Sequence, residues 1–526
     1  MFYLALLIGI YSYIIFFLGL LGFIYRPVVI LFTAAFIFTT VFFIKRNLEI
    51  SSFKDKTVSF IKKSTKIELI LLAIISFQAL VNLIGALGPE LGFDALWYHL
   101  TLPKIYLLNH SISFIPGGIF YYSAMPKLTE MLYVAGLSFG SEIIAKLIHF
   151  SFGILILIAL YSLSRKFLSK IFSLLALVLF YSNLVVGWIS ITAYIDLART
   201  FFEIMALWGF VEWFEKKEKK WFVLSAATLG LAISTKLLAL GTLLIVSGLI
   251  IFYFLSKKKK LKDLFTGLFV YWFICLLIPL PWFIFSFIHT GNPVYPFFTN
   301  IYPVKLGFNL INPLNLSDPI SPLYVIFLPI AVLIYRKFKP SLKIVLFYSL
   351  LAVLFWYITP QTGGGRFILP YLPAFSLISV VVVKLIEKIR LQKIFIGLII
   401  VLSLFSILYR LVANSKYILV VLDKESKSQF LSSHLNFAFG DFYDIDGYFA
   451  KKIKHADKVL LYGFHNLYYV NFPFIDSSFV KKGDTFNYIA AQGNNFPQRF
   501  KFWNLIYYNK TTNIRLYSIG GLKWTY

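Results

Sequence analysis

Long apolar runs, separated by short polar segments, make up most of this chain. A hydrocarbon layer about 30 Å thick accepts helices of roughly 20 apolar residues, because a helix satisfies its own backbone polar groups. The pattern therefore predicts an all-α polytopic membrane protein with about thirteen spans. We expect these spans near residues 3–22, 27–44, 67–88, 143–163, 171–189, 195–214, 221–235, 237–256, 264–288, 322–335, 344–359, 367–386 and 393–412.

Basic residues between the apolar runs predict the orientation of the chain. Cytoplasmic loops collect Lys and Arg, so the basic loops belong inside. These loops are 45–66, 165–170, 215–220, 257–262, 336–343 and 384–393. Alternate counting then places the N-terminus in the cytoplasm, and residues 89–142, 289–321 and everything after 412 outside. The count requires two separate spans on either side of Lys236.

Composition excludes a soluble globular protein. Hydrophobic residues make up 59% of the 526 residues and charged residues 14%, against roughly 45–50% and 25% in soluble domains. The net charge of +27 lies in short loops, where it favours membrane lipid headgroups. No RNA- or DNA-binding motif accompanies this charge, so we expect no nucleic-acid partner.

The chain divides into three expected parts. Residues 1–66 form an N-terminal extension of two spans, expected to be retained because the first apolar run lacks a basic leader and a cleavage site. Residues 67–412 form the transmembrane domain of a multi-pass protein of the cell membrane. Residues 413–526 are expected to form a small extracytoplasmic soluble domain, α/β or mixed, with a strand near 458–463.

The first outer loop carries a group of chemically capable residues within 90–104. Asp94 is suited to general base catalysis, in which it takes a proton from an acceptor hydroxyl. One helical turn would bring Asp94 beside Tyr98. We also expect Tyr98, His99 and Lys104 to bind substrate. The alternative is an ordinary loop aspartate that caps the following helix.

A second carboxylate enters a span from its outer end, in the segment Tyr194-Ile-Asp196-Leu-Ala-Arg199. Charged groups inside a span are costly and usually face a cavity or a partner. Pairing of Asp196 with Arg199 at i, i+3 is one interpretation. In the other, Asp196 faces Asp94 across a cavity, where it tunes the charge of Asp94 or binds the acceptor.

Two cations are candidates for a phosphate site. Lys236 is expected at the outer face, where it suits a phosphate that leaves with its lipid, or else reaches to the headgroups. The glycines of 363–365 expose backbone N–H groups to a phosphate, and Arg366 can grip it with two nitrogens. The alternative is a flexible hairpin with one interfacial arginine. Pro370 and Pro373 should open the following helix.

No cluster in the sequence has metal-ligand spacing. The seven histidines are scattered, and Asp441, Asp444 and Asp446 lack the frame of an EF-hand. A divalent-ion site at these aspartates is one interpretation, and a solvated loop is the one that we favour. We therefore expect no cofactor, since the spacing gives a divalent metal no support.

Six short motifs follow one another between residues 67 and 386. They are Phe93-Asp94-Ala-Leu-Trp-Tyr98-His99-Leu, Ala-Met-Pro126-Lys-Leu-Thr-Glu130-Met-Leu-Tyr, Ala193-Tyr-Ile-Asp196-Leu, Thr235-Lys236, Gly291-Asn-Pro-Val-Tyr-Pro296 and Gly365-Arg366-Phe-Ile-Leu-Pro370-Tyr-Leu-Pro373. Their succession resembles the GT-C superfamily of membrane glycosyltransferases. The resemblance is to the branch of the protein O-mannosyltransferases and the lipid A aminoarabinose transferases.

The resemblance implies a polyprenyl- or dolichyl-phosphate sugar donor and an inverting transfer to an acceptor glycan, lipid or protein outside the cytoplasm. Asp94 matches the catalytic acidic position of the first loop, and Asp196 matches a second acidic position. Lys236 and Arg366 match positions that would handle the lipid phosphate. Many relatives have two adjacent acidic residues in the first loop, whereas Ala95 follows Asp94 here, which weighs against metal dependence.

Two other classes of function remain open at this point. A transporter or flippase of lipid-linked saccharides would place polar residues through the midplane of its spans and show internal symmetry. This chain has no evident repeat and concentrates its polar chemistry at one face. A noncatalytic scaffold would tolerate substitution of Asp94, Asp196 and Arg366.

Overall fold

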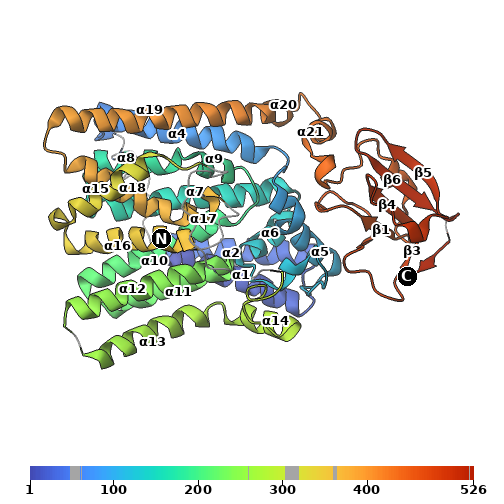
Figure 1. Ribbon diagram of the computed structural model, residues 1–526, viewed down its shortest axis with the longest axis horizontal. Coiled ribbons are helices and arrows are strands. Elements are labelled where there is room, and N and C mark those ends of the chain that lie inside the picture. The colour runs from blue at the N-terminus through green and yellow to red at the C-terminus, as the bar shows by residue number, and fades with distance from the viewer. Residues whose placement is uncertain (48–59, 61, 259, 302–318, 359–363, 521) are drawn as a thin grey trace.

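The structure is a computed structural model that describes residues 1–47, 60, 62–258, 260–301, 319–358, 364–520 and 522–526. It is a bundle of long helices with a group of short strands at one end (Figure 1). Parts of the predicted basic loops 45–66 and 257–262, and of the predicted outer loop 289–321, lie outside the described residues.

The helices account for all of the bundle within the described residues. They are α1 (Phe2–Leu20), α2 (Arg26–Asn47), α4 (Lys66–Leu87), α5 (Thr101–Asn109), α6 (Leu128–Ser138), α7 (Glu142–Ser164), α8 (Lys170–Tyr181), α9 (Leu184–Ile189), α10 (Asp196–Lys216), α11 (Lys219–Thr235), α12 (Leu240–Ser256), α13 (Leu261–Leu277), α14 (Leu280–Thr290), α15 (Leu323–Leu333), α16 (Pro340–Ile358), α17 (Gly365–Ile368), α18 (Leu372–Lys384), α19 (Ile389–Asn414), α20 (Ile418–Val421), α21 (Lys427–His434) and α22 (Tyr448–Lys452).

Many of these helices can cross a membrane. In the part of the chain that the structure describes, seven helices are long and apolar enough, or eight if one bent pair is a single span. Three shorter apolar helices, 26–42, 170–181 and 323–333, accompany them. The prediction of an all-α polytopic membrane protein is confirmed, whereas the count of thirteen spans is not.

One predicted span differs from the structure, whereas one predicted pair of spans agrees with it. The predicted span 264–288 is broken into α13 and α14, which are bent by 67°. Pro279 and Pro281 lie at the break, and a proline removes a backbone donor and disrupts a continuing helix. The pair predicted on either side of Lys236 is two separate helices, α11 and α12, as the loop count required.

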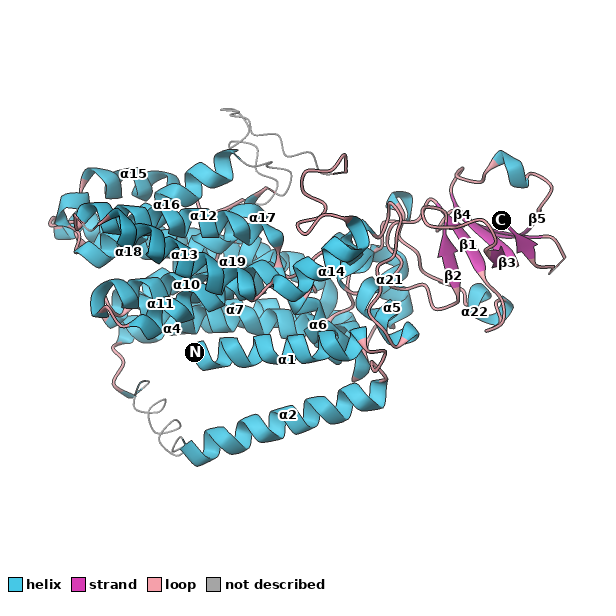
Figure 2. Ribbon diagram, turned by 90° about the horizontal axis from the view of Figure 1, so that it is seen from below, coloured by secondary structure: helices cyan, strands magenta, loops and turns pink. Residues whose placement is uncertain are grey.

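The N-terminal extension lies at one edge of the bundle (Figure 2). The hydroxyls of Tyr11 on α1 and Thr33 on α2 share a hydrogen bond of 2.6 Å, and the Tyr11 ring stacks on Phe32. Outward-facing residues such as Leu31 and Phe38 are 70% and 72% exposed, which suits contact with lipid. The domain boundaries predicted at 66 and 412 remain predictions.

The C-terminal part contains a mixed five-stranded sheet, in the order β2-β1-β4-β6-β5. Strand β1 pairs in parallel with β2 and with the central strand β4, and the remaining pairs of this sheet are antiparallel. The strands are β1 (Val459–Tyr462), β2 (Phe474–Asp476), β4 (Tyr488–Gln492), β5 (Asn504–Asn509) and β6 (Ile514–Ser518), while β3 (Thr485–Phe486) and β7 (Trp524–Thr525) form a separate pair. The predicted small mixed domain is thus confirmed, including its strand near 458–463. The apolar helical stretch before it continues to Val421, beyond the predicted limit at 412.

Lys104, on α5, joins this C-terminal domain to the segment predicted as the first outer loop. Its Nζ donates hydrogen bonds to the carbonyls of Tyr468 and Val470, both at 2.7 Å, and to Asn471 Oδ1 at 2.8 Å. The backbone N–H of Tyr468 also donates to the carbonyl of Leu96 at 3.2 Å. Burial lowers the pKa of Lys104 to about 8. The side chain predicted to bind substrate therefore serves as a tether between two parts of the chain.

We expect a Lys104→Met variant to loosen this contact. Three hydrogen bonds from an ammonium group are lost, partly offset by relief of its burial, so docking should weaken by about 1.5 kcal/mol. Protease cleavage between 421 and 459 should then be roughly tenfold faster. Lys481→Met, at an exposed lysine of the same domain, is the matched control. Equal cleavage of Lys104→Met and wild type would contradict the tether.

Candidate active site

Four predicted charged residues come from four separate segments. Asp94 precedes a π-helical turn at 95–99, and Asp196 is the first residue of α10. Lys236 lies between the end of α11 and the short turn before α12, and Arg366 lies in α17. Each residue is therefore at a helix terminus, where the chain changes direction and a charged side chain need not be buried in the middle of a span.

These four residues form a connected set of ion pairs. Arg366 Nη1 donates to Asp94 Oδ2 at 2.8 Å, and Arg366 Nη2 lies 3.3 Å from Asp196 Oδ2. Lys236 Nζ donates to the other oxygen of Asp196 at 2.7 Å. The guanidinium also lies over the ring of Tyr194, 4.5 Å from its centroid. Arg366 thus bridges Asp94 and Asp196, the two carboxylates that one interpretation of the sequence set across a cavity from each other.

The two carboxylates differ in access. The side chain of Asp94 is 19% exposed, whereas that of Asp196 is 1% exposed. Asp196 therefore sits behind the two cations and orients them, while Asp94 can be reached from the cavity.

Arg199 has a different partner from the one that its spacing suggested. Its Nε donates to Glu203 Oε1 at 2.6 Å, and Glu203 Oε2 accepts a hydrogen bond from the Thr242 hydroxyl at 2.6 Å. The i, i+4 spacing of Arg199 and Glu203 gives a buried pair along one face of α10. Asp196, at the first residue of that helix, is left for Lys236 and Arg366.

The ion pairs border a cavity of about 260 Å³. Four predicted site residues line it, namely Asp94, Tyr98, Lys236 and Arg366. The rest of the lining is aromatic or apolar and consists of Tyr122, Met125, Leu237, Leu238, Pro296, Phe297 and Phe367. The buried Nε of Arg366 donates to none of the described residues. The cavity therefore combines an apolar wall, a carboxylate and a cation with a spare donor.

His99 lies behind this cavity and does not line it. Its Nδ1 is 2.8 Å from Glu130 Oε1, and its ring packs against Tyr98 with centroids 4.2 Å apart. Burial lowers the pKa of His99, although the carboxylate of Glu130 opposes this effect. The structure therefore places His99 as a support for Tyr98, which itself stacks on Tyr122 at 3.9 Å.

The glycine segment before Arg366 is described only in part. Gly363 lies outside the described residues, whereas Gly364 has a φ of +52°. Only glycine adopts this backbone conformation without strain, so Gly364 allows the chain to turn into α17. The helix then changes to a 3₁₀ turn at 369–371 before α18, as the prolines predicted.

Two residues of the site were not singled out from the sequence. The Tyr194 hydroxyl accepts a hydrogen bond from the backbone N–H of Asp94 at 3.2 Å. Glu90 binds the backbone of both carboxylate-bearing segments. Tyr194 is close in sequence to Asp196, and Glu90 is close to Asp94. This closeness was the available signal for both residues, but it does not reveal a contact between distant segments.

The tail aspartates have structural partners. Asp444 accepts hydrogen bonds from the backbone N–H groups of Phe449 and Ala450, and Asp446 accepts one from Tyr448. They cap α22, as carboxylates commonly do at a helix start. Within the described ranges, no three His, Cys, Asp or Glu side chains are grouped to hold a metal ion. The expectation of a site without a cofactor stays a prediction.

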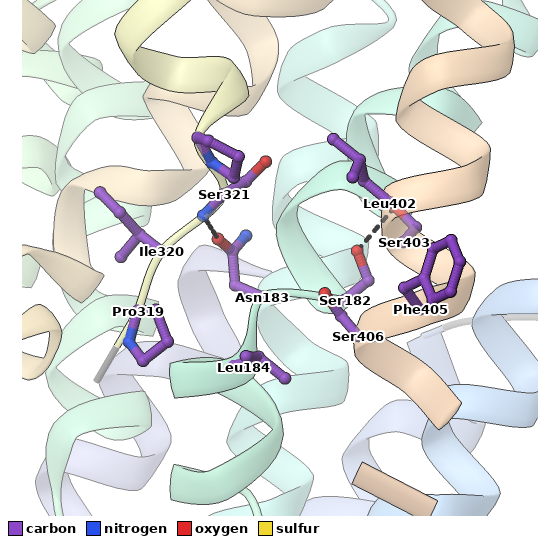
Figure 3. Close-up of a pocket in the computed structure, with 11 residues that line it drawn as sticks. Ser182, Asn183, Leu184, Pro319, Ile320, Ser321, Leu402, Ser403, Phe405 and Ser406 are labelled. Carbon is purple, nitrogen blue, oxygen red and sulfur yellow. Dashed lines mark hydrogen bonds between the residues drawn. The ribbon is translucent and has the colours of Figure 1, made fainter. Parts of the chain in front are cut away.

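A second cavity, of about 190 Å³, differs in chemistry (Figure 3). The Ser182 hydroxyl donates to the Ser403 hydroxyl at 2.8 Å, and Asn183 Oδ1 accepts from the Ser321 N–H at 2.7 Å. No charged side chain lines it among the described residues. It therefore lacks an acid, a base or a phosphate-binding cation.

Comparisons with known proteins show what the chain and its fold are similar to. Residues 132–285 match the family model described as dolichyl-phosphate-mannose-protein mannosyltransferase. A comparison with curated protein sequences finds no match. The structure is similar to ArnT from Cupriavidus metallidurans bound to undecaprenyl phosphate, with a TM-score of 0.60 and 13% identity over 86% of this chain and 97% of that chain. The apo state of ArnT gives a TM-score of 0.57, with the same identity and coverage. The chain therefore has a fold similar to that of ArnT.

Proposed function

We propose that this GT-C membrane protein is a glycosyltransferase. It takes a sugar from a polyprenyl-phosphate donor and transfers it, with inversion, to an acceptor outside the cytoplasm. The observation that carries the proposal is the single cavity in which Asp94 is accessible while Lys236 and Arg366 supply two cations. The likeness of the fold to ArnT bound to undecaprenyl phosphate supports a lipid-phosphate donor.

The two cations provide the binding site for the donor phosphate. Departure of a lipid phosphate from the anomeric carbon develops negative charge, which preorganised cations stabilise in a water-poor site. Arg366 offers a planar fork of donors, of which Nε has no described partner. Lys236 adds a point charge held by Asp196 at 2.7 Å. Asp196 is therefore assigned to keep both cations charged and oriented.

Asp94 is assigned as the general base. Its carboxylate is paired with Arg366 at 2.8 Å. A donor phosphate that competes for the guanidinium would weaken this ion pair and free the carboxylate, because Arg366 Nη1 would then divide its donors between two anions. The freed Asp94 can then accept the proton of the acceptor hydroxyl as that oxygen attacks the sugar. Donor binding would thus prepare the base for the acceptor.

The acceptor is proposed to enter from the side of the C-terminal domain. Phe93, next to Asp94, packs against Phe439 with centroids 5.7 Å apart and lies 6.4 Å from the ring of His465. Both partners belong to the C-terminal domain, and both are exposed. In the proposed topology the N-terminus is cytoplasmic and this domain is extracytoplasmic, so a glycan, lipid or protein acceptor could reach Asp94 along this boundary.

A reconstituted assay tests the proposed function. The purified full-length protein in liposomes is supplied with a panel of polyprenyl-phosphate sugars and with extracellular glycans, lipids and peptides, and products are identified by mass spectrometry. We expect one lipid phosphate released for each sugar transferred, with inverted anomeric configuration. Movement of an intact lipid-linked sugar across the liposome, without a covalent product, would instead establish a transporter.

A further inference from the structure

Glu90 is a buried carboxylate to which the mechanism above gives no role. It lies between the end of α4 and Asp94 and is 1% exposed. A carboxylate so far removed from water must be compensated by hydrogen bonds or opposite charge, because its desolvation is costly. The partners of Glu90 therefore show what the buried charge is used for.

Both oxygens of Glu90 accept hydrogen bonds from the backbone. Oε1 accepts from the N–H groups of Leu91 at 2.9 Å and Gly92 at 2.6 Å. Oε2 accepts from the N–H group of Ala193 at 2.6 Å, across 103 positions of sequence. Gly92 lies two residues before Asp94, and Ala193 lies three residues before Asp196. One carboxylate thus connects the two segments that carry the acidic residues of the site.

Two further contacts reinforce this connection. The Tyr194 hydroxyl accepts from the N–H of Asp94 at 3.2 Å, and the Tyr133 hydroxyl donates to the carbonyl of Tyr194. A Cβ atom at Gly92 would lie 2.9 Å from Glu90 Oε1 and 3.0 Å from Tyr194 Cε1. The glycine is therefore required by the close approach of the two segments.

The surroundings of Glu90 also fix its own position. Lys146 Nζ donates to the carbonyls of Gly88 at 2.6 Å and Pro89 at 3.1 Å, directly before Glu90. The Tyr469 hydroxyl, from the C-terminal domain, donates to the backbone carbonyl of Glu90 at 2.9 Å. The residue is held from the membrane side and from the domain side, so its carboxylate serves as a rigid spacer.

From these contacts we infer that Glu90 is a positioning residue. Its carboxylate sets the separation of Asp94 and Asp196, and with it the geometry in which Arg366 bridges them. The inference rests on the proposed function for its catalytic meaning. Lys236 and Arg366 are carried by other segments, so the affinity for a lipid phosphate should depend little on Glu90.

Kinetics of a Glu90→Gln variant test the inference. The amide keeps one acceptor oxygen but directs an N–H₂ group toward backbone donors, which forces the segments apart. Because displacement of a catalytic group by about 1 Å can cost roughly 100-fold in rate, we expect kcat to fall by that factor. The affinity for undecaprenyl phosphate, measured by native mass spectrometry, should change less than about threefold.

Two further variants separate positioning from general stability. Gly92→Ala keeps the carboxylate but crowds it, and should also lower kcat in a protein that still folds. Glu68→Gln alters another buried carboxylate at the opposite end of α4, where it caps the helix with Thr65. This control should lower the melting temperature without changing kcat of the folded fraction. A Glu90→Gln variant whose activity merely follows its folded fraction would overturn the inference.

The inference can be tested even if the proposed function fails. Cryo-electron microscopy of the wild type and Glu90→Gln proteins would measure the separation of Asp94 and Asp196 directly. We expect a change of about 1 Å or more, with loss of at least one contact of Arg366. An unchanged separation would overturn the positioning role whatever the wild-type protein catalyses, whereas absence of sugar transfer by the wild type would count against the proposed function alone.

Discussion

An Asp94→Asn variant should insert and fold as the wild type does, yet transfer sugar roughly 1,000-fold more slowly, since general base catalysis contributes about 10²–10⁴ in rate. Asparagine has nearly the shape of aspartate but cannot accept the proton of the acceptor hydroxyl. The variant also removes one carboxylate from Arg366, which leaves the guanidinium freer for phosphate. We therefore expect kcat to fall while the affinity for the donor is kept or rises.

The measurement is transfer from a lipid-phosphate sugar in liposomes, together with binding of undecaprenyl phosphate. Asp263→Asn, at an exposed aspartate of α13, controls for the change of charge. Full activity of Asp94→Asn would refute its assignment as the base. If Asp94→Asn lowers both the activity and the amount of folded protein, Asp94→Glu distinguishes a catalytic effect from a folding effect. This variant restores a carboxylate and should recover part of kcat.

An Arg366→Gln variant should lose donor affinity by roughly 100-fold, because truncating one partner of a buried charge pair typically costs 2–5 kcal/mol. Arg366 contacts Asp94 and Asp196 together, at 2.8 and 3.3 Å. Without it, two carboxylates face the cavity with Lys236 as the remaining cation of the four-residue set. Repulsion of the donor phosphate should then add to the lost hydrogen bonds.

Arg366→Lys distinguishes charge from shape. Lysine keeps the positive charge but not the planar fork, so we expect a loss of about tenfold, intermediate between wild type and Arg366→Gln. Affinity for the lipid-phosphate group is measured with undecaprenyl phosphate, and Arg499→Gln at a surface arginine of the C-terminal domain is the control. Wild-type affinity in both Arg366 variants would exclude this residue from phosphate binding.

Hydrophobic patterning predicted the membrane helices well but not their number. A run of apolar residues shows that a segment prefers lipid, and it does not show where the helix bends. The predicted span 264–288 illustrates this, since its prolines divide it into two helices at 67°. Several other apolar segments form helices shorter than a full crossing, such as α8 and α15.

The site was predictable where a charged residue stood at the predicted outer end of a span. Asp94, Asp196, Lys236 and Arg366 share that position, and the structure brings them together. Sequence spacing could not show which neighbours of Asp94 face inward. The turn at 95–99 is a π-helix, so α-helical spacing does not apply to it.

The individual partners of a side chain on distant segments could not be predicted from local spacing. Local spacing suggested Arg199 as the partner of Asp196, yet Arg199 pairs with Glu203 at 2.6 Å. Asp196 pairs instead with Lys236 and Arg366. Glu90 is the same kind of case, since its partner Ala193 is 103 positions away. Such contacts depend on how helices pack, which the order of residues along one segment does not reveal.

The two carboxylates and the two cations of the site balance one another in charge. A lipid phosphodiester brings one negative charge, whereas the phosphomonoester left after transfer carries between 1.5 and 2 at neutral pH. Because Asp94 takes up the proton of the acceptor hydroxyl, the transfer step itself leaves the total charge unchanged and moves negative charge from this carboxylate to the phosphate. Once Asp94 releases that proton to water, the excess of negative charge in the site increases. The site would then bind the sugar donor more tightly than the lipid phosphate left after transfer. Electrostatic repulsion would favour release of that lipid phosphate into the bilayer.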